Sequence, residues 1–275
     1  MKPLHYVRMV LWSFFGIRRR AGAEEELSKA KLVPLLLAAI FLAACFAALL
    51  ICLALTASSA FAAPPAHRVP DTMAQRMQAC VACHGEEGRA TNEGYFPRIA
   101  GKPAGYLYNQ LLNFRGGQRG NPAMAHLTSH LSDEYLREIA EYFAALELPY
   151  PAARAANISP AVLARGEQLV KQGDAARGLP ACVQCHGAAM TGVSPAMPGL
   201  LGLPRDYLVG QLGAWQTGLR KAAAPDCMAQ LARKLSSEDI TAVSSWLASQ
   251  PVAVHAKPAA WVPGRLPIEC GSHRP

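Results

Sequence analysis

Two short motifs of the same design contain the residues of this 275-residue chain best suited to carry chemistry. They are a Cys-x-x-Cys-His motif and its copy 102 residues later, formed by Cys80, Cys83 and His84 and by Cys182, Cys185 and His186. In an exported protein this pattern is the attachment signature of c-type haem. Two thiols one helical turn apart can bond the two vinyl groups of one porphyrin, and the next imidazole becomes the proximal iron ligand. The motifs therefore predict two covalently bound haems c.

Two other uses of such motifs fit less well. A thioredoxin-type dithiol does not require the histidine. A zinc site built from both motifs would offer six ligands to a metal that takes four. Duplication and export favour haem over both.

The sixth iron ligand separates an electron carrier from an enzyme that needs an open iron. Met124 lies 40 residues after His84, and Met228 lies 42 residues after His186. Both methionines precede a leucine by seven residues, so they share one register, and we expect them to be the sixth ligands. The ordinary role of a methionine is to fill a core. The rival ligands are His126 and His130 in the first repeat, Met190 and Met197 in the second, and the thiolate of Cys227.

An internal repeat extends well beyond the two motifs. Pro97, Tyr106 and Phe114 recur as Pro198, Tyr207 and Trp215, each 101 residues later, and Ser132 recurs as Ser236. Apolar positions recur at helical spacing in both copies, and no convincing strand run is present. Ser132 and Ser236 are expected helix N-caps, and a helix is expected from Ser159-Pro160 to about Gln172. We expect an all-α protein with domains at 63–150 and 151–250 and a proline-rich tail at 251–275.

The N-terminal residues 1–62 form a separate segment, expected to be a signal peptide or a membrane anchor. Residues 35–55 are drawn only from Leu, Ala, Ile, Phe and Cys, and basic residues precede them. Such a helix covers about 30 Å, enough to cross a bilayer, and a possible tether spans 32–56. Ala60-Phe61-Ala62 is a small-x-small cleavage site. Leu42 to Cys45 also matches a bacterial lipoprotein box. All three alternatives export residues 63–275.

Composition excludes some other functions. The net charge is +8, but residues 63–275 carry a surplus of only four basic side chains. No dense basic face follows the leader, so nucleic-acid binding is not expected.

Residues 76–250 resemble the di-haem cytochromes c4. The resemblance is carried by both haem motifs, the Met124 and Met228 segments and the stretch from Phe96 to Gly101. It implies two tandem class I cytochrome c folds, haem edges facing across the domain interface, and electron transfer in the bacterial periplasm. The long leader, Cys227 and the tail with Cys270 depart from the family pattern.

Several residues remain outside the motifs. Cys227 and Cys270 are left over after haem attachment, and either form a disulfide that holds the tail or stay unpaired. Arg98, Arg115 and Arg119 are candidates to bind haem propionates, the alternative being an exposed surface role. Tyr106 and Tyr207 are expected to pack at the interface between the repeats or to hydrogen-bond a propionate.

Three functions are compatible with this pattern. The first is a non-enzymatic periplasmic electron carrier, with a quinol-oxidising complex or a dehydrogenase as donor and a terminal haem-copper oxidase as acceptor. The second is the cytochrome subunit of a periplasmic dehydrogenase that oxidises a sulfur compound or an alcohol. The third is a di-haem redox enzyme, which would need an open iron that Met124 and Met228 argue against.

Overall fold

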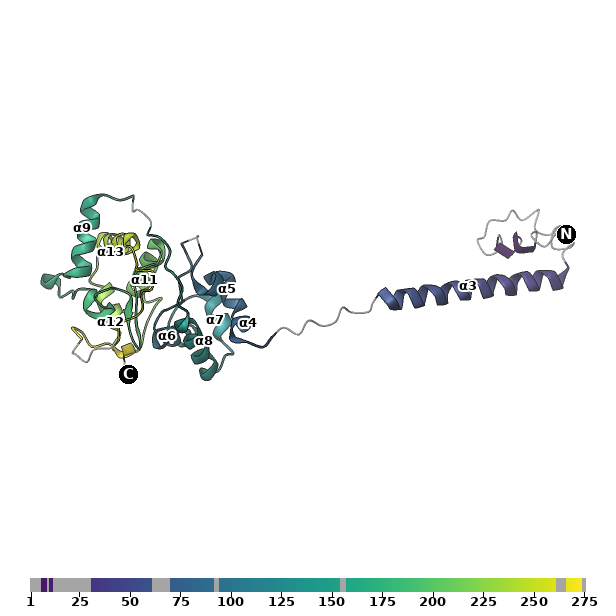
Figure 1. The fold of residues 1–275 in the computed structure, drawn as a ribbon, viewed down its shortest axis with the longest axis horizontal. Helices are drawn as coiled ribbons and strands as arrows, with labels where there is room; N and C mark the ends of the chain where they lie inside the picture. Colours follow the sequence, from purple (N-terminus) through teal and green to yellow (C-terminus); the bar gives the residue numbers. More distant parts are fainter. Residues whose placement is uncertain are drawn as a thin grey trace. The chain divides into compact units, whose positions relative to one another are not determined.

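The computed structural model describes residues 6–8, 10–11, 31–60, 70–91, 94–153, 157–260 and 266–273 (Figure 1). The chain divides into two compact units, residues 1–68 and residues 69–275. Phe61 and Ala62 of the expected cleavage site lie outside the described residues, as do most of the basic residues that precede the apolar run.

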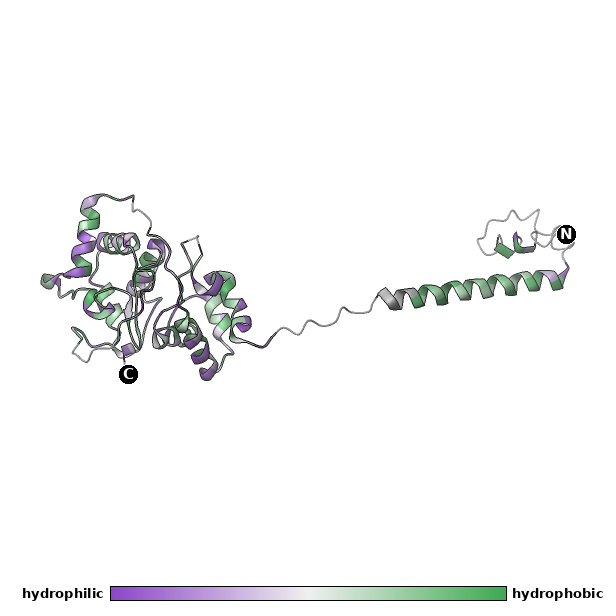
Figure 2. Ribbon diagram, viewed as in Figure 1, coloured by the Kyte–Doolittle hydropathy of each residue, from purple (hydrophilic) through white to green (hydrophobic). Residues whose placement is uncertain are grey.

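In the first unit, helix α3 spans Leu32–Ala60. Figure 2 shows it to be hydrophobic along almost its whole length. Among the described helices it is the one long and apolar enough to cross a membrane, with a candidate span of 24 residues at Leu32–Leu55. Its large side chains are exposed, among them Leu37, Phe41 and Leu55. A core helix of a soluble domain would bury such side chains, so α3 has the character of a membrane span or a signal segment.

Five helices form the described part of the first repeat. They are α4 (Met73–Arg76), α5 (Gln78–His84), α6 (Ala104–Arg115), α7 (Pro122–Thr128) and α8 (Asp133–Ala145), with a 3-10 turn η1 (Glu86–Gly88) after α5. The predicted N-cap is confirmed, because the Ser132 side chain accepts a hydrogen bond from the Tyr135 amide. The core of the repeat includes Leu107 of α6 together with Leu136, Ile139 and Phe143 of α8.

The second repeat follows the same order. It contains α9 (Pro160–Lys171), η2 (Ala175–Arg177), α10 (Val183–His186), α11 (Arg205–Thr217), α12 (Cys227–Ala232) and α13 (Ser237–Ser249), and the tail ends in η3 (Gly271–His273). Helix α9 begins at the predicted proline and ends one residue before the predicted boundary. Two strands of two residues each, β1 (Gly192–Val193) and β2 (Met197–Pro198), form an antiparallel pair that the sequence did not indicate.

Helices α9 and α13 pack closely because residue 166 is a glycine. A Cβ atom at Gly166 would lie 2.2 Å from the Ala242 carbonyl oxygen. Leu169 and Val170 of α9 and Val243 and Leu247 of α13 then form one apolar cluster. The helical fold class is confirmed, and each repeat has its own apolar cluster.

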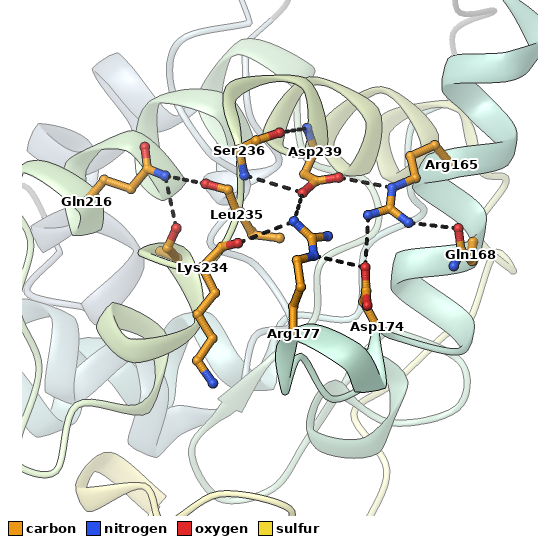
Figure 3. A network of polar contacts seen from close by, with 10 residues as sticks. Arg165, Gln168, Asp174, Arg177, Gln216, Lys234, Leu235, Ser236 and Asp239 are labelled. Atoms are coloured by element: carbon orange, nitrogen blue, oxygen red, sulfur yellow. Dashed lines mark hydrogen bonds and ion pairs between the residues drawn. The ribbon is translucent and has the colours of Figure 1, made fainter.

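A polar network fixes the start of α13 (Figure 3). Asp239 is 5% exposed. Its carboxylate accepts hydrogen bonds from Arg165 Nε at 3.0 Å and from Arg177 Nη1 at 2.7 Å. It also forms a capping box with Ser236. Burial alone would raise the pKa of Asp239, but the hydrogen bonds from Arg177, the Ser236 amide and Arg165 hold this pKa below its usual value.

We predict that Asp239→Ala lowers the free energy of unfolding by about 2 kcal/mol at neutral pH, because two guanidinium groups and a helix end lose their acceptor. The lowered pKa means that this stability is present above about pH 4 and is lost as the pH falls through the folded-state value. Denaturant unfolding followed by circular dichroism at pH 7 and at pH 3 measures both effects. Glu238→Ala, one residue earlier on the same turn, is the control and should change stability much less, because the Glu238 side chain is exposed. Equal losses in the two variants would contradict the role given to the network.

Candidate haem sites

In the first repeat, helix α5 contains the whole Cys-x-x-Cys-His motif. Cys80 and Cys83 are three residues apart on this helix, which separates their thiols by about one turn. Cys80 packs against the apolar cluster of the repeat, whereas Cys83 is exposed. The chain turns sharply after His84, because Gly85 has a φ of 77°. A Cβ atom there would lie 2.3 Å from the Ala90 carbonyl oxygen, so the turn requires a glycine.

The second repeat builds the same unit on the shorter helix α10. Cys182 is its N-cap residue, Cys185 and His186 lie within it, and Gly187 follows with a φ of 82°. Cys182 packs against the apolar cluster of this repeat. None of the four motif cysteines forms a disulfide. Each pair is therefore available for thioether bonds.

Both motif histidines are oriented by the same hydrogen bond. His84 Nδ1 lies 2.9 Å from the Pro97 carbonyl oxygen, and His186 Nδ1 lies 2.8 Å from the Pro198 carbonyl oxygen. A carbonyl accepts but cannot donate, so Nδ1 carries the proton and the lone pair of Nε2 is left for a metal. Burial lowers the pKa of both histidines. The imidazoles are thus held neutral and fixed in orientation, as ligation to iron requires.

The two predicted sixth ligands lie on short helices of matching position. Met124 is in α7 and Met228 is in α12, and α7 packs on α6 as α12 packs on α11. An Asx cap fixes each helix start, since Asn121 accepts from the Met124 amide and Asp226 accepts from the Ala229 amide. Both methionines are only partly buried. Neither belongs to the apolar cluster of its repeat. A methionine that only fills a core would be buried in such a cluster, so Met124 and Met228 lie in a different environment from a core methionine.

The rival ligands are placed less favourably. His126 and His130 are exposed. Met190 and Met197 are 3% and 6% exposed, and Met190 belongs to the apolar cluster of the second repeat. Cys227 forms a disulfide with Cys270, so of the two alternatives left open by the sequence the structure has the paired one. A disulfide sulfur is not a thiolate, so Cys227 is not available as an iron ligand.

The repeats meet through two buried arginines, related by the internal duplication. Arg119 donates to Tyr207 Oη at 2.9 Å and to Gln211 Oε1 at 2.7 Å. In the opposite direction, Arg220 of the second repeat donates to Gln110 Oε1 of the first at 2.8 Å. The same two arginines form an antiparallel backbone bridge. Tyr106 also faces this interface, where Arg220 approaches its hydroxyl at 3.4 Å. The interface placement predicted for both tyrosines is thereby confirmed.

This interface contains unbalanced positive charge. Arg119 and Arg220 are 8% and 4% exposed, and no carboxylate forms an ion pair with either among the described residues. Trp215 Nε1 is also buried and finds no acceptor in the described part of the chain. A buried charge or N–H without a partner is costly. A cofactor with two carboxylate groups would supply the missing negative charge and an acceptor for Trp215 Nε1, so the residues present fit haem.

The other two candidate arginines are engaged by the protein itself. Arg98 is buried and donates to the carbonyl oxygens of Leu148 and Pro149 in the segment that links the repeats. Arg115 donates to the Leu131 carbonyl and to Asp133. Both guanidinium groups therefore have a structural role, because each binds a backbone carbonyl of another segment. Arg119 therefore remains the candidate of the three, together with Arg220 and Trp215 beside it. In the sequence, Arg220 could be recognised only as the residue that repeats Arg119.

Two helical modules, each carrying a Cys-x-x-Cys-His helix and an oriented histidine, define a tandem c-type cytochrome. The family described as cytochrome c oxidase, cbb3-type, subunit III matches residues 68–143. A thiosulfate dehydrogenase electron acceptor from Stutzerimonas stutzeri is 39% identical over 62% of this chain and 78% of its own length. A cytochrome c4 from Pseudomonas aeruginosa is 35% identical over 66% of this chain and 90% of its own length. The chain belongs to the di-haem cytochrome c4 family, and it binds two covalent haems c.

Two further comparisons complete this assignment. The crystal structure of reduced cytochrome c4 from Pseudomonas stutzeri matches with a TM-score of 0.55 and 31% identity, over 64% of this chain and 95% of that chain. The leader matches separately, since a family described as a protein of unknown function, DUF2970, covers residues 4–57. The protein is therefore an electron-transfer cytochrome joined to an N-terminal segment with relatives of its own.

Proposed function

We propose that this protein accepts single electrons from a periplasmic thiosulfate dehydrogenase and passes them to a terminal acceptor such as a haem-copper oxidase. The observation that carries the proposal is the similarity to thiosulfate dehydrogenase electron acceptors from two organisms, at 39% and 35% identity. It favours the sulfur-oxidising branch of the dehydrogenase alternative over a quinol-oxidising donor or an alcohol dehydrogenase. The chain itself would be a carrier rather than an enzyme.

The proposed ligands follow from the site geometry. Cys80 and Cys83 would hold one haem by thioether bonds and Cys182 and Cys185 the other, while His84 and His186 would bind the irons through Nε2. Met124 and Met228 would complete the two coordination spheres. Bound haem supplies reversible one-electron chemistry at iron. A thioether ligand favours the ferrous state and leaves no open position for substrate, which suits a carrier.

The residues between the two repeats would orient the cofactors and shield them. Arg119 and Arg220 lie buried at the junction, and Trp215 presents an N–H there without a protein acceptor. Charge-assisted hydrogen bonds from these groups to the propionates would fix both haems against one interface. Such fixed groups need little rearrangement when an electron moves, which keeps transfer between the haems fast.

Residues 63–275 would act in the periplasm, tethered to the inner membrane by α3. A distinct family covers residues 4–57, including the polar stretch that precedes the helix. A cleavable signal peptide needs only a short basic region before its apolar stretch. A segment that is matched by a protein family of its own is better explained as a retained anchor than as a leader removed near Ala62.

The axial ligands are tested by substitution. We predict that Met124→Ala and Met228→Ala each remove about half of the weak red charge-transfer band that a thioether gives on ferric haem, and that the double variant removes all of it. Each change should also lower the midpoint potential of one haem and open that iron to cyanide. Absorption spectra and a redox titration of the purified two-haem protein measure these effects.

Met197→Leu is the matched control, because Met197 is buried and should leave the band intact. If Met124→Ala spared the band while His126→Gln or His130→Gln altered the spectrum, the first haem would be bis-histidine.

The tether is tested by mass. We predict that intact protein extracted from membranes has the mass of the full 29.4 kDa chain plus two haems. Deleting residues 1–62 in favour of a cleavable signal peptide should release the cytochrome into the soluble periplasmic fraction. A wild-type mass equal to residues 63–275 plus two haems would show that the leader is cleaved.

The electron donor is tested in a reconstituted reaction. Oxidised cytochrome mixed with catalytic amounts of a thiosulfate dehydrogenase should become fully reduced on addition of thiosulfate, as seen in the α band of ferrous haem c. A mixture without thiosulfate should stay oxidised. Reduction by ascorbate but not by enzyme plus thiosulfate would reject this donor while leaving the carrier function intact.

A further inference from the structure

A lysine of the first repeat lies buried against the second. Lys102 is 3% exposed, and its Nζ atom donates to the Gly199 carbonyl oxygen at 2.9 Å. No carboxylate of the described residues lies within ion-pair distance of this amine. An amine in such a place is costly in its charged form, since a single carbonyl replaces its hydration. Apolar packing alone therefore does not account for a buried lysine at this position.

Lys102 reaches the loop that orients the second motif histidine. Gly199 directly follows Pro198, and the Pro198 carbonyl accepts the hydrogen bond from His186 Nδ1 at 2.8 Å. The start of α6 is pressed against the same loop, since a Cβ atom on Gly105 would lie 2.8 Å from the Pro195 carbonyl oxygen. Lys102 is close enough to His186 for its positive charge to lower the pKa of that imidazole. The same repulsion would act on any positive charge that His186 binds.

The internal duplication shows that this arrangement is one-sided. At the 101-residue shift, Leu203 replaces Lys102 and Arg98 replaces Gly199. Leu203 packs in the apolar cluster of the second repeat. The first repeat therefore has a permanent cation in its own loop, held by the linker carbonyls, whereas the second receives an amine from its neighbour. Only the amine can change its charge near neutral pH.

The surroundings of Lys102 allow it to titrate. Burial, with a smaller contribution from the nearby Arg98 charge, lowers the pKa of Lys102 to about 7. Lys102 also lines a pocket. The titratable and charged side chains facing it are those of Arg98 and His186 and, around the pocket, of Glu141, Glu147, Tyr150, His255 and Lys257. Glu147 is paired with Lys257.

We propose that Lys102 is the tuning residue of the second haem, whose reduction it couples to the uptake of one proton. The proposal rests on ligation of that haem by His186. When one electron from the donor converts ferric to ferrous iron, the site loses one positive charge, and the neutral amine of Lys102 binds one proton from water. Conversely, the protonated amine favours the ferrous state and raises the midpoint potential. Among the described residues, the charge that acts on the first motif histidine is that of Arg119, which does not titrate near neutral pH.

The test is a spectroelectrochemical titration of the full two-haem protein from about pH 5 to about pH 9, a range that brackets the pKa of Lys102 near 7. Met228→His marks the second haem, because it should shift one midpoint and spare the other. In the wild type, that marked midpoint should fall as the pH rises through the titration range of Lys102. The other midpoint should change less.

Two substitutions separate charge from structure. Lys102→Gln keeps an N–H donor but removes the charge, so the second midpoint should be low and nearly independent of pH. Lys102→Arg keeps a permanent charge, so the midpoint should stay at its low-pH value throughout. A purely structural role would make both variants differ from wild type in the same direction at every pH.

Once Met228→His has assigned the second midpoint, a flat wild-type profile for that haem overturns the proposal without any Lys102 variant. A pH dependence that survives in Lys102→Gln overturns it as well, because another group would then be responsible. If Met228→His shifted neither midpoint, the ligation scheme would fail instead, and the two failures are therefore distinguishable.

Discussion

The hydrogen bond from a histidine ring to a proline carbonyl is the interaction on which each half of this protein depends. It fixes which ring nitrogen carries the proton, and so leaves Nε2 of His84 and of His186 free for iron. The loop that supplies the carbonyl must lie beside the motif helix, which the glycine turn after each histidine makes possible. In both repeats the rest of the fold holds this helix and this loop in contact.

A second constraint comes from the junction of the repeats. Two guanidinium groups are buried there among tyrosine and glutamine oxygens, with no carboxylate partner in the described chain. Hydrogen bonds to neutral acceptors satisfy their N–H groups but do not neutralise them. The interface therefore favours negative charge, and the carboxylates of the two haems would supply that charge. In this sense cofactor binding and association of the repeats stabilise each other.

Much of this arrangement could be predicted from sequence because the chain contains two copies of it. Register between the copies identified the motif cysteines, and it distinguished Met124 and Met228 from methionines such as Met190, which fills a core. The N-caps at Ser132 and Ser236 followed from local chemistry. The short β pair did not, because two residues per strand leave no alternating pattern to detect. The contact of Lys102 with Gly199 was equally hidden, since it joins residues 97 positions apart at a place where the repeats differ.

Some of the differences between the repeats lie at or near their junction. Trp215 stands where the first repeat has Phe114, Lys102 where the second has Leu203, and the disulfide from Cys227 fixes only the second methionine helix. The tail beyond that disulfide also reaches the first repeat, where Asn109 donates to the Ser272 carbonyl. Two identical haem sites would have equal potentials and no preferred direction for an electron. Divergence near the junction would therefore give the two haems different environments, although both repeats keep the same Cys-x-x-Cys-His motif.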